Sequence, residues 1–451
     1  MSKIRLSLSN SIQTSKTMMI RSFSDNLHWM RNLGFFLLFL WSSGTQAQNT
    51  FSAFVDSAMN NNPEAVSIKT QLRQYDLENQ MISAVLQSPK MYLSSDVLFA
   101  PYFNNNDKLV DIAPSDQAVG YDVGITNGGL YSALFNIDIP VLKGAEVNHR
   151  QLQNEFAKKK LTIRLETIRT ELQQSVGALY FDALSKQATV ANNKKNAALL
   201  NEEIQLVKLL TRKGMYRISD YKLLELELQS DSVLLKSSVN DLELAVRQLK
   251  AACGIQNTEV ADLTNPTMEM STPVMGNSLF TQSYEQDSLA AANQTDIFND
   301  QYRPQINLFA NSGLNSTSIP SIERHVGLSA GVHLSYMLFD GHQKKINEQQ
   351  QMLAVDEAAT QKELKLKEVR SQSNAYLQTI KKTKDELVQQ KQIQQQYDAL
   401  LNLYRDELQR AQISVIDFVA YLKKYSDVNQ AVVQKEITLK KLINEYNYWN
   451  H

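Results

Sequence analysis

Two very long helical segments constrain this chain more than any other feature. Residues 143–211 and 341–410 carry apolar side chains every three to four positions, and neither segment contains proline. At 1.5 Å per residue, each helix would be roughly 100 Å long. Because globular helices are far shorter on average, we expect neighbouring helices to support these two along their length, as in a coiled coil. Shorter helices are predicted over 63–88, 217–253 and 413–449.

The long segments belong to an internal repeat. VLKG (141–144) and LFDG (338–341) each end a predicted strand and open a long helix, and they lie 197 residues apart. Asp220 and Asp417, which follow breaks in the helical pattern, share this offset. A unit of helix, strand, strand, long helix, break and helix therefore occurs twice.

Four segments alternate with a period of two: 89–103, 128–140, 303–314 and 326–338. Each has one apolar face and one small or polar face. Each is also long enough for the ~9–11 residues that a tilted strand needs to cross a bilayer. The uncharged or acidic polar face suits a water-filled lumen, which favours a membrane barrel over a half-buried soluble sheet.

Four strands are too few to close a barrel, since about eight is the lower limit. Open sheet edges are not tolerated in lipid, so we expect the chain to oligomerise. Three chains would supply twelve strands, an even number within the range of known barrels. The predicted fold class is a mixed α and β membrane protein. It has mostly long coiled-coil-like helices and four antiparallel strands per chain, which form a shared 12-stranded barrel in a trimer.

The composition excludes several classes of protein. Lys+Arg (46) and Asp+Glu (47) nearly cancel, so there is no basic field for nucleic acid. The mean hydropathy of −0.34 argues against a bundle of transmembrane helices. Cys253 is the only cysteine, which excludes an intrachain disulfide or a CxxC site, and we interpret it as a small packed residue.

No constellation of catalytic or metal-binding residues stands out. The six histidines show no HExxH motif and no paired spacing. The segment Gly327–Gly331 matches G-x-S-x-G in letters, but it falls within a predicted strand rather than at a strand–turn–helix elbow. We therefore expect no enzyme activity, no cofactor and no metal.

The N-terminus has the pattern of an export signal. Arg31 precedes the apolar run Leu33–Trp41, and Thr45-Gln46-Ala47 provides a small-x-small cleavage site. The run is well short of the ~20 residues of a spanning helix. We predict a signal peptide over 1–47, with Met30 as an alternative translation start, and a mature protein that leaves the cytoplasm. A buried or anchoring N-terminal helix is the alternative.

These signals divide the chain into seven segments. They are the signal peptide (1–47), the helices of repeat 1 (48–88), hairpin 1 with a long extracellular loop (89–140), the long helix, tip and return helix of repeat 1 (141–255), a linker with the helices of repeat 2 (256–302), hairpin 2 (303–340), and the long helix, tip, return helix and C-terminus of repeat 2 (341–451).

Several stretches together resemble the TolC family of outer-membrane efflux ducts. They are AFVDSAMNNNPEAVSIK (53–69), with its Asn-Pro break, KGMYRISDYKLLELELQ (213–229), YRPQINLFANSGL (302–314) and LSYMLFDGHQKK (334–345). No single one of these motifs is specific to the family, but the order, duplication and spacing of the motifs together are specific. The resemblance covers about residues 51–449.

The resemblance implies a homotrimer with its barrel in the outer membrane and a helical barrel in the periplasm. It implies a passive exit duct of a tripartite efflux or type I secretion system. The implied partners are a periplasmic adaptor (membrane fusion) protein, an inner-membrane pump of the proton-driven or ABC type, and outer-membrane lipid. The alternative is a periplasmic adaptor or coiled-coil scaffold protein without a membrane barrel.

The break RKGMYRISDYKLL (212–224) is predicted to be the periplasmic tip, where a long helix reverses. Gly214 can adopt a positive φ and end the helix, and Ser219 or Asp220 can cap the next one. The resemblance implies that Asp220 and Asp417 form carboxylate rings that narrow the entrance. Helix capping is the alternative role of both, and the two roles are compatible.

The second break has Ala411 where the first has Gly214, and Ser414 or Asp417 as its cap. Because alanine is strained in a left-handed conformation, we expect that this turn need not mirror the first. Leu408 and Ile413 stand where the family has a Tyr and an Arg that help to lock the entrance, and Ala420 stands where it has a second Asp. Two arginines, Arg217 and Arg410, are predicted as alternative partners in the gate.

Overall fold

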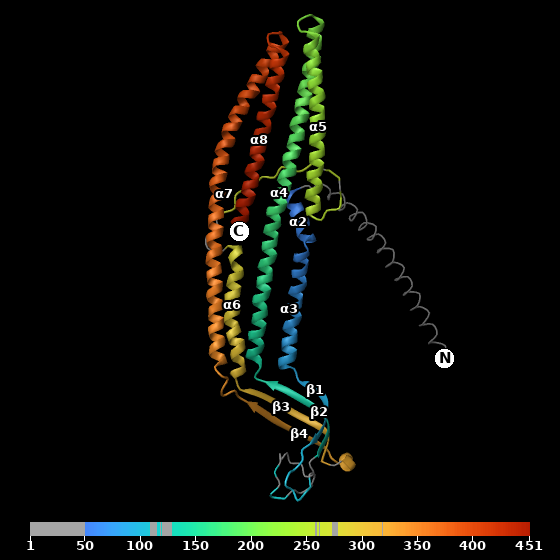
Figure 1. The fold of residues 1–451 in the computed structure, drawn as a ribbon, viewed down its shortest axis with the longest axis vertical. Coiled ribbons are helices and arrows are strands. Elements are labelled where there is room, and N and C mark those ends of the chain that lie inside the picture. Colours follow the sequence, from blue (N-terminus) through green and yellow to red (C-terminus); the bar gives the residue numbers. More distant parts are fainter. Residues whose placement is uncertain are drawn as a thin grey trace, which may run out of the picture. The chain divides into compact units, whose positions relative to one another are not determined.

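The computed structural model describes residues 50–108, 115–117, 119, 129–257, 259–260, 262–272, 278–317 and 319–451. The predicted signal peptide and most of the first strand–strand loop lie outside these residues. The chain is built mainly of long helices, with one four-stranded sheet (Figure 1).

The elements follow the duplicated order that the sequence predicts. Among the described residues, the α-helices are α2 (Phe51–Asn61), α3 (Pro63–Gln87), α4 (Gly144–Arg212), α5 (Ile218–Ala252), α6 (Leu279–Asn299), α7 (Gln343–Gln409) and α8 (Val415–Trp449). The strands are β1 (Lys90–Phe99), β2 (Gly129–Val141), β3 (Gln305–Ser316) and β4 (Val326–Ser335). Short 3-10 helices are formed by η2 (Asp300–Tyr302) and η3 (Ile319–Arg324). The two longest helices have 69 residues in α4 and 67 in α7. None of the described helices is long and apolar enough to cross a membrane.

Local side-chain bonds explain where the helices begin. Asn62 caps α3, and its side-chain oxygen accepts the N–H of Ala65 at 2.9 Å, while Pro63 occupies the first helical position. Before α7, the Asp340 carboxylate accepts the backbone N–H groups of His342 (2.9 Å) and Lys344 (2.8 Å). These bonds satisfy donors that the start of a helix leaves free.

The four strands form one antiparallel sheet in the order β1-β2-β3-β4. Their register places alternate residues on opposite faces, as the period of two predicts. One face is mostly apolar and carries Met91, Leu93, Val97, Phe135, Ile137, Leu308, Leu314, Leu328, Val332 and Leu334. The other is mostly polar and carries Ser94, Asp96, Ser132, Asn136, Asp138, Asn307, Asn311, Ser329 and His333.

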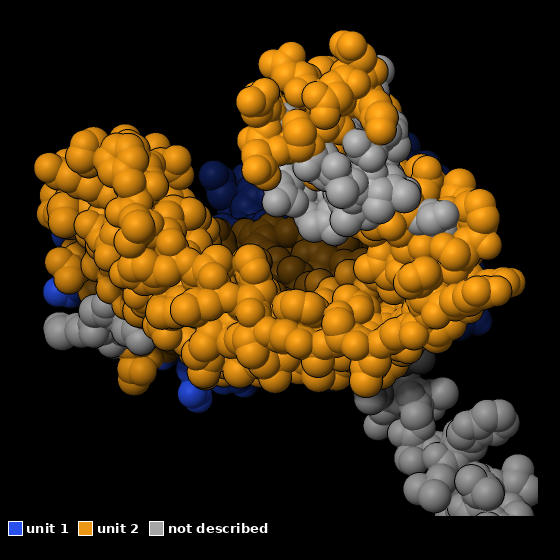
Figure 2. Space-filling model, turned by 90° about the horizontal axis from the view of Figure 1, so that it is seen from below, with its two compact units in different colours: residues 1–61, 172–270, 378–445 blue, residues 62–171, 271–377, 446–451 orange. Residues whose placement is uncertain are grey.

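The chain divides into two compact units, each of which takes segments from both repeats. Unit 1 contains residues 1–61, 172–270 and 378–445, and unit 2 contains the remainder (Figure 2). In unit 1, a core of α2, α4, α5 and α8 surrounds Tyr180, whose hydroxyl donates to the carbonyl of Thr264 at 2.6 Å. Cys253 is fully buried in this core, and burial raises the pKa of its thiol to about 11.

Unit 2 contains the sheet together with α3, α6, the first part of α4 and the first part of α7. Figure 2 views this unit from its strand end, where its surface curves around a hollow. Arg164 on α4 binds both carboxylate oxygens of Glu64 on α3, at 2.7 and 3.0 Å. Near the sheet, His149 at the start of α4 contacts the buried carboxylate of Asp300 at 2.9 Å. These pairs fix the helices that lead into the strands.

Candidate functional site at the hairpin tips

The first helical hairpin, α4–α5, is closed by a left-handed glycine. Gly214 has φ of 78°. The N–H of Met215 donates to the carbonyl of Leu210 at 3.0 Å, and the N–H of Gly214 donates to the carbonyl of Thr211 at 3.0 Å. This pair of bonds is a Schellman motif, which satisfies carbonyls left free at a helix end. Gly214 therefore has the conformation that the sequence predicts for it.

The second helical hairpin, α7–α8, is closed in the same way although it lacks the glycine. Ala411 has φ of 53°. The N–H of Gln412 donates to the carbonyl of Glu407 at 2.8 Å, and the N–H of Ala411 donates to that of Leu408 at 3.1 Å. The sequence allowed this turn to differ from the first, but the backbone of the second turn follows that of the first. The helix-end bonds form in both turns, and Ala411 takes the left-handed conformation that these bonds require.

Both aspartates stand in the first turn of a return helix and hold its start. At α5, Asp220 accepts the backbone N–H of Arg217 at 2.9 Å, which is one arm of a capping box. At α8, the hydroxyl of Ser414 donates to Asp417 at 2.6 Å and accepts the Asp417 N–H at 3.1 Å. Ser414 is thus the cap of the second return helix, and Arg217 takes the corresponding position in the first.

The remaining predicted tip residues lie at the surface. Ser219 is exposed in the first turn of α5, and the side chain of Arg217 is exposed beside it. Arg410 is exposed directly after α7, and its backbone N–H donates to the carbonyl of Asp406 at 3.2 Å. Asp417 is exposed and Asp220 is half-buried, so the tips present both carboxylates and both arginines to their surroundings.

Sequence reasoning missed the residue that joins the two tips, which is Tyr216. Tyr216 lies in the first turn, and its hydroxyl reaches the second turn. There it donates to the carbonyl of Ile413 at 2.7 Å, and the carbonyl of Leu408 is a second acceptor at 3.2 Å. Burial raises the pKa of Tyr216, and the nearby carboxylate of Asp220 adds to this shift. The only available signal was that Tyr216 and Ile413 are equivalent in the repeat, and that equivalence does not predict contact.

Beneath the tips, the two hairpins share one apolar cluster. Its buried members come from all four helices, and Leu408 and Phe418 are fully buried in it. The set is Leu200, Ile204, Val207, Leu224, Leu408, Val415, Phe418 and Val419. In this chain, Leu408 packs in a core, and Ile413 packs at its edge and accepts the Tyr216 hydroxyl through its carbonyl.

A partly buried group of ion pairs crosses the same region. Arg405 on α7 binds Glu203 at 2.5 Å and Glu202 at 2.9 Å, both on α4. Glu203 is almost completely buried. Burial raises the pKa of Glu203, and Arg405 offsets the shift only in part. A buried charge of this kind depends strongly on its partner.

Further from the tips, α4 and α8 meet along a polar seam. Ser185 donates to Gln434 at 2.8 Å, and one helical turn further along, Gln430 donates to Thr189 at 2.7 Å. Asn192 continues the series with Ser426 at 3.3 Å. As the position on α4 rises, the position on α8 falls, which is antiparallel pairing. The hairpins are therefore held in register by uncharged hydrogen bonds as well as by the apolar cluster.

No protein-family model matches the sequence, and no curated protein matches it. Among solved structures, the outer membrane protein VceC from Vibrio cholerae has a TM-score of 0.61 at 13% identity, with 89% of this chain and 96% of that chain covered. The chain has the TolC-like fold.

Two further structures show the same likeness. The outer membrane channel CmeC from Campylobacter jejuni has a TM-score of 0.59 at 12% identity, covering 89% of this chain and 86% of its own. The open state of the MtrE outer membrane channel from Neisseria gonorrhoeae has a TM-score of 0.60 at 10% identity, covering 89% and 88%. The resemblance inferred from the sequence is therefore confirmed for the fold.

Proposed function

We propose that the protein is a passive efflux-type channel, the outer-membrane exit duct of a tripartite efflux or type I secretion system. The observation that carries the proposal is the sheet, which has one apolar and one polar face and leads into long helical hairpins. The polar face would line a wet lumen, and the apolar face would contact lipid. In this reading the duct conducts cargo and performs no chemistry.

The exposure of the apolar face supports a membrane setting. In the single chain, Leu93 is 82% exposed and Leu328 is 79% exposed. Contiguous apolar surface of this kind requires lipid or another chain to cover it. Among the residues that the structure describes, the outer strands β1 and β4 each pair on one side only. Because open edges are not tolerated in lipid, we propose that three chains join edge to edge as a homotrimer with a 12-stranded barrel.

The helices would then extend into the periplasm, with the hairpin tips at the entrance. A periplasmic adaptor protein and an inner-membrane pump, proton-driven or ABC type, would act at this end. In a trimer, Asp220 and Asp417 would each be present three times, and rings of carboxylates select and hold cations. Arg217 and Arg410 are exposed beside them and are the proposed partners of these carboxylates in the closed entrance.

The decisive experiment measures where the protein resides and what it conducts. The outer-membrane fraction is extracted in detergent, and the mass and single-channel conductance of the purified protein are determined. We expect a trimer of low conductance. A soluble monomer would overturn the proposal and favour the alternative, a periplasmic adaptor or coiled-coil scaffold.

The gate assignment needs a separate test because both aspartates also hold helix starts. Asp220→Ala and Asp417→Ala are each expected to raise the conductance. Ser414→Ala is the matched control, since it breaks the cap of α8 but keeps the Asp417 carboxylate. An equal rise in Ser414→Ala would assign the effect to the cap, and unchanged conductance in both aspartate variants would remove them from the gate.

A further inference from the structure

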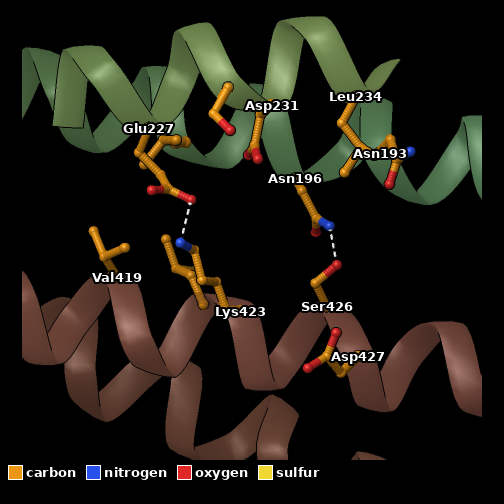
Figure 3. Close-up of a pocket in the computed structure, with 12 residues that line it drawn as sticks. Asn193, Asn196, Glu227, Asp231, Leu234, Val419, Lys423, Ser426 and Asp427 are labelled. Atoms are coloured by element: carbon orange, nitrogen blue, oxygen red, sulfur yellow. Dashed lines mark hydrogen bonds and ion pairs between the residues drawn. The ribbon is translucent and has the colours of Figure 1, made fainter. Parts of the chain in front are cut away.

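A cleft of about 350 Å³ opens between α5 and α8, with α4 contributing to its wall (Figure 3). All of its lining residues belong to unit 1. We propose that this cleft binds an organic amine, a cation with a short hydrocarbon body. A cleft of this size is within the range of small-molecule sites.

The charge of the cleft favours a cation. Three carboxylates line it, Glu227, Asp231 and Asp427, together with a single ammonium group, Lys423. Glu227 binds Lys423 at 2.8 Å, so this ion pair neutralises one carboxylate. Asp231 projects from α5 toward α8 beside the ion pair (Figure 3). Burial, together with Glu227, raises the pKa of Asp231. Two carboxylates thus remain without a matching cation inside the cleft.

A buried amide points to a ligand independently of the charge. Asn193 on α4 is only 9% exposed, and it lines the cleft. Its side chain makes no hydrogen bond with any residue in the part of the chain that the structure describes. By contrast, the neighbouring Asn196 donates to Ser426 on α8 (Figure 3). The side-chain nitrogen and oxygen of Asn193 are not among the described buried polar atoms that lack a partner, so both open onto the cleft. A ligand in the cleft would find there an amide donor and acceptor that no other described residue engages.

The apolar part of the wall defines the rest of the ligand. Leu234 is 54% exposed at the cleft, whereas Leu200 and Val419 line it but are already buried in the apolar cluster. A bare metal ion would use the carboxylates but gain nothing from Leu234. An ammonium group attached to a hydrocarbon body would pair with Asp231 and cover Leu234 as well. The lining therefore favours an organic amine over an inorganic cation.

The position of the cleft gives binding a structural consequence. Asp231 belongs to the first helical hairpin and Asp427 to the second. A ligand held by both would join the hairpins at a level between the tips and the core around Tyr180. Ligands that bind only the folded arrangement stabilise it. The proposal is independent of the channel function, since binding is measured directly and requires no conductance.

The test uses the purified full-length protein and two probes of the same shape. Binding of 4-phenylbutylamine and of uncharged 4-phenylbutanol is measured by isothermal titration calorimetry. We expect the amine to bind and the alcohol to bind much more weakly. Asp231→Asn should weaken binding of the amine about tenfold, as expected for loss of a charge-assisted hydrogen bond. Asp427→Asn provides a second, independent variant on the opposite wall.

Asp385→Asn is the matched control, because it removes an exposed carboxylate of α7 outside the cleft. It should leave the affinity unchanged. Circular dichroism checks that each variant keeps its helical content. The proposal is overturned if the amine does not bind, if the alcohol binds equally well, or if both cleft variants keep the wild-type affinity.

Discussion

Position 411 holds an alanine in a backbone conformation that usually belongs to glycine. Gly214 and Ala411 close equivalent turns with φ of 78° and 53° and with equivalent hydrogen bonds. Left-handed backbone costs a non-glycine residue roughly 1–2 kcal/mol, because Cβ approaches the following carbonyl. The turn between the helices is therefore relaxed at Gly214 in the first repeat and strained at Ala411 in the second.

Exchanging the two residue types should have opposite effects. Gly214→Ala is expected to lower the free energy of unfolding by about 1 kcal/mol. Ala411→Gly should raise it by a few tenths of a kcal/mol, because relief of strain is partly offset by the greater freedom of glycine in the unfolded chain. Chemical denaturation followed by circular dichroism measures both. Destabilisation by both variants would contradict the assignment of strain to Ala411.

The buried pair of Glu203 and Arg405 leads to a prediction that depends on pH. Arg405→Gln leaves the Glu203 carboxylate buried without its cation, which should lower the free energy of unfolding by about 3–5 kcal/mol at neutral pH. Because burial raises the pKa of Glu203, its carboxyl group holds a proton more tightly in the folded protein than in the unfolded chain. Protonation of Glu203 therefore adds to the free energy of unfolding. This contribution is complete below the unfolded pKa of about 4.3 and is lost as the pH rises through the higher folded pKa.

The loss caused by Arg405→Gln should accordingly be smaller at acidic pH, where Glu203 is protonated, than at pH 7. Arg247→Gln is the control, since Arg247 forms an exposed pair with Glu243 on a single helix. That change should alter the free energy of unfolding by less than about 0.5 kcal/mol. Equal losses at both pH values for Arg405→Gln would show that the charge of Glu203 is not the cause.

At the scale of secondary-structure elements, two paired glycines in the sheet differ sharply in the space around them. Gly313 on β3 has φ of 154°, and an added Cβ would lie 2.2 Å from the carbonyl oxygen of Ala133 on β2. Gly327 on β4 pairs directly with Gly313, but an added Cβ would meet nothing within 4 Å. Within this pair, only Gly313 must lack a side chain for β2 and β3 to approach each other.

Gly313→Ala is expected to separate β2 from β3 locally and to reduce the amount of assembled protein, because the clash is with backbone that cannot move aside without loss of pairing. Gly327→Ala should assemble normally. The fraction of heat-modifiable oligomer on gels measures both effects. Normal assembly of Gly313→Ala would mean that the sheet accommodates a different register at this point.

The periodic elements could be predicted from the sequence because long repeats average out local exceptions. The return helix predicted over 217–253 is found as Ile218–Ala252, and the long helix predicted over 341–410 is found as Gln343–Gln409. The strand predicted over 326–338 ends earlier, at Ser335, although the apolar alternation runs on. The fold class follows from such patterns, since period and length distinguish helices from strands.

Contacts between hairpins could not be predicted in the same way. The link from Tyr216 to the second turn depends on how two hairpins pack, and one sequence contains no signal for that distance. The same holds for Arg405, which reaches Glu203 on another helix. The sequence does predict roles that depend on the pattern along a single helix. An example is Asp220, which caps the start of its helix.

At the scale of the whole molecule, the proposed channel requires the two faces of the sheet to meet different surroundings. Val332 and His333 are neighbours on β4, but Val332 pairs with Leu308 on the apolar face and His333 pairs with Asn307 on the polar face. Lipid against the first face and water against the second would make the same substitution costly at one position and harmless at the other.

Val332→Lys places a charge on the proposed lipid face, where a lysine costs roughly 2–4 kcal/mol at the membrane midplane. We expect it to reduce the proposed trimer severely, as measured by the heat-modifiable oligomer in outer-membrane extracts. His333→Lys, one residue away, should yield normal amounts of trimer because its side chain would remain in water. If both variants assemble normally, the apolar face does not contact lipid. If both variants fail to assemble, the polar face does not contact water. Either of these two results would contradict a water-filled barrel.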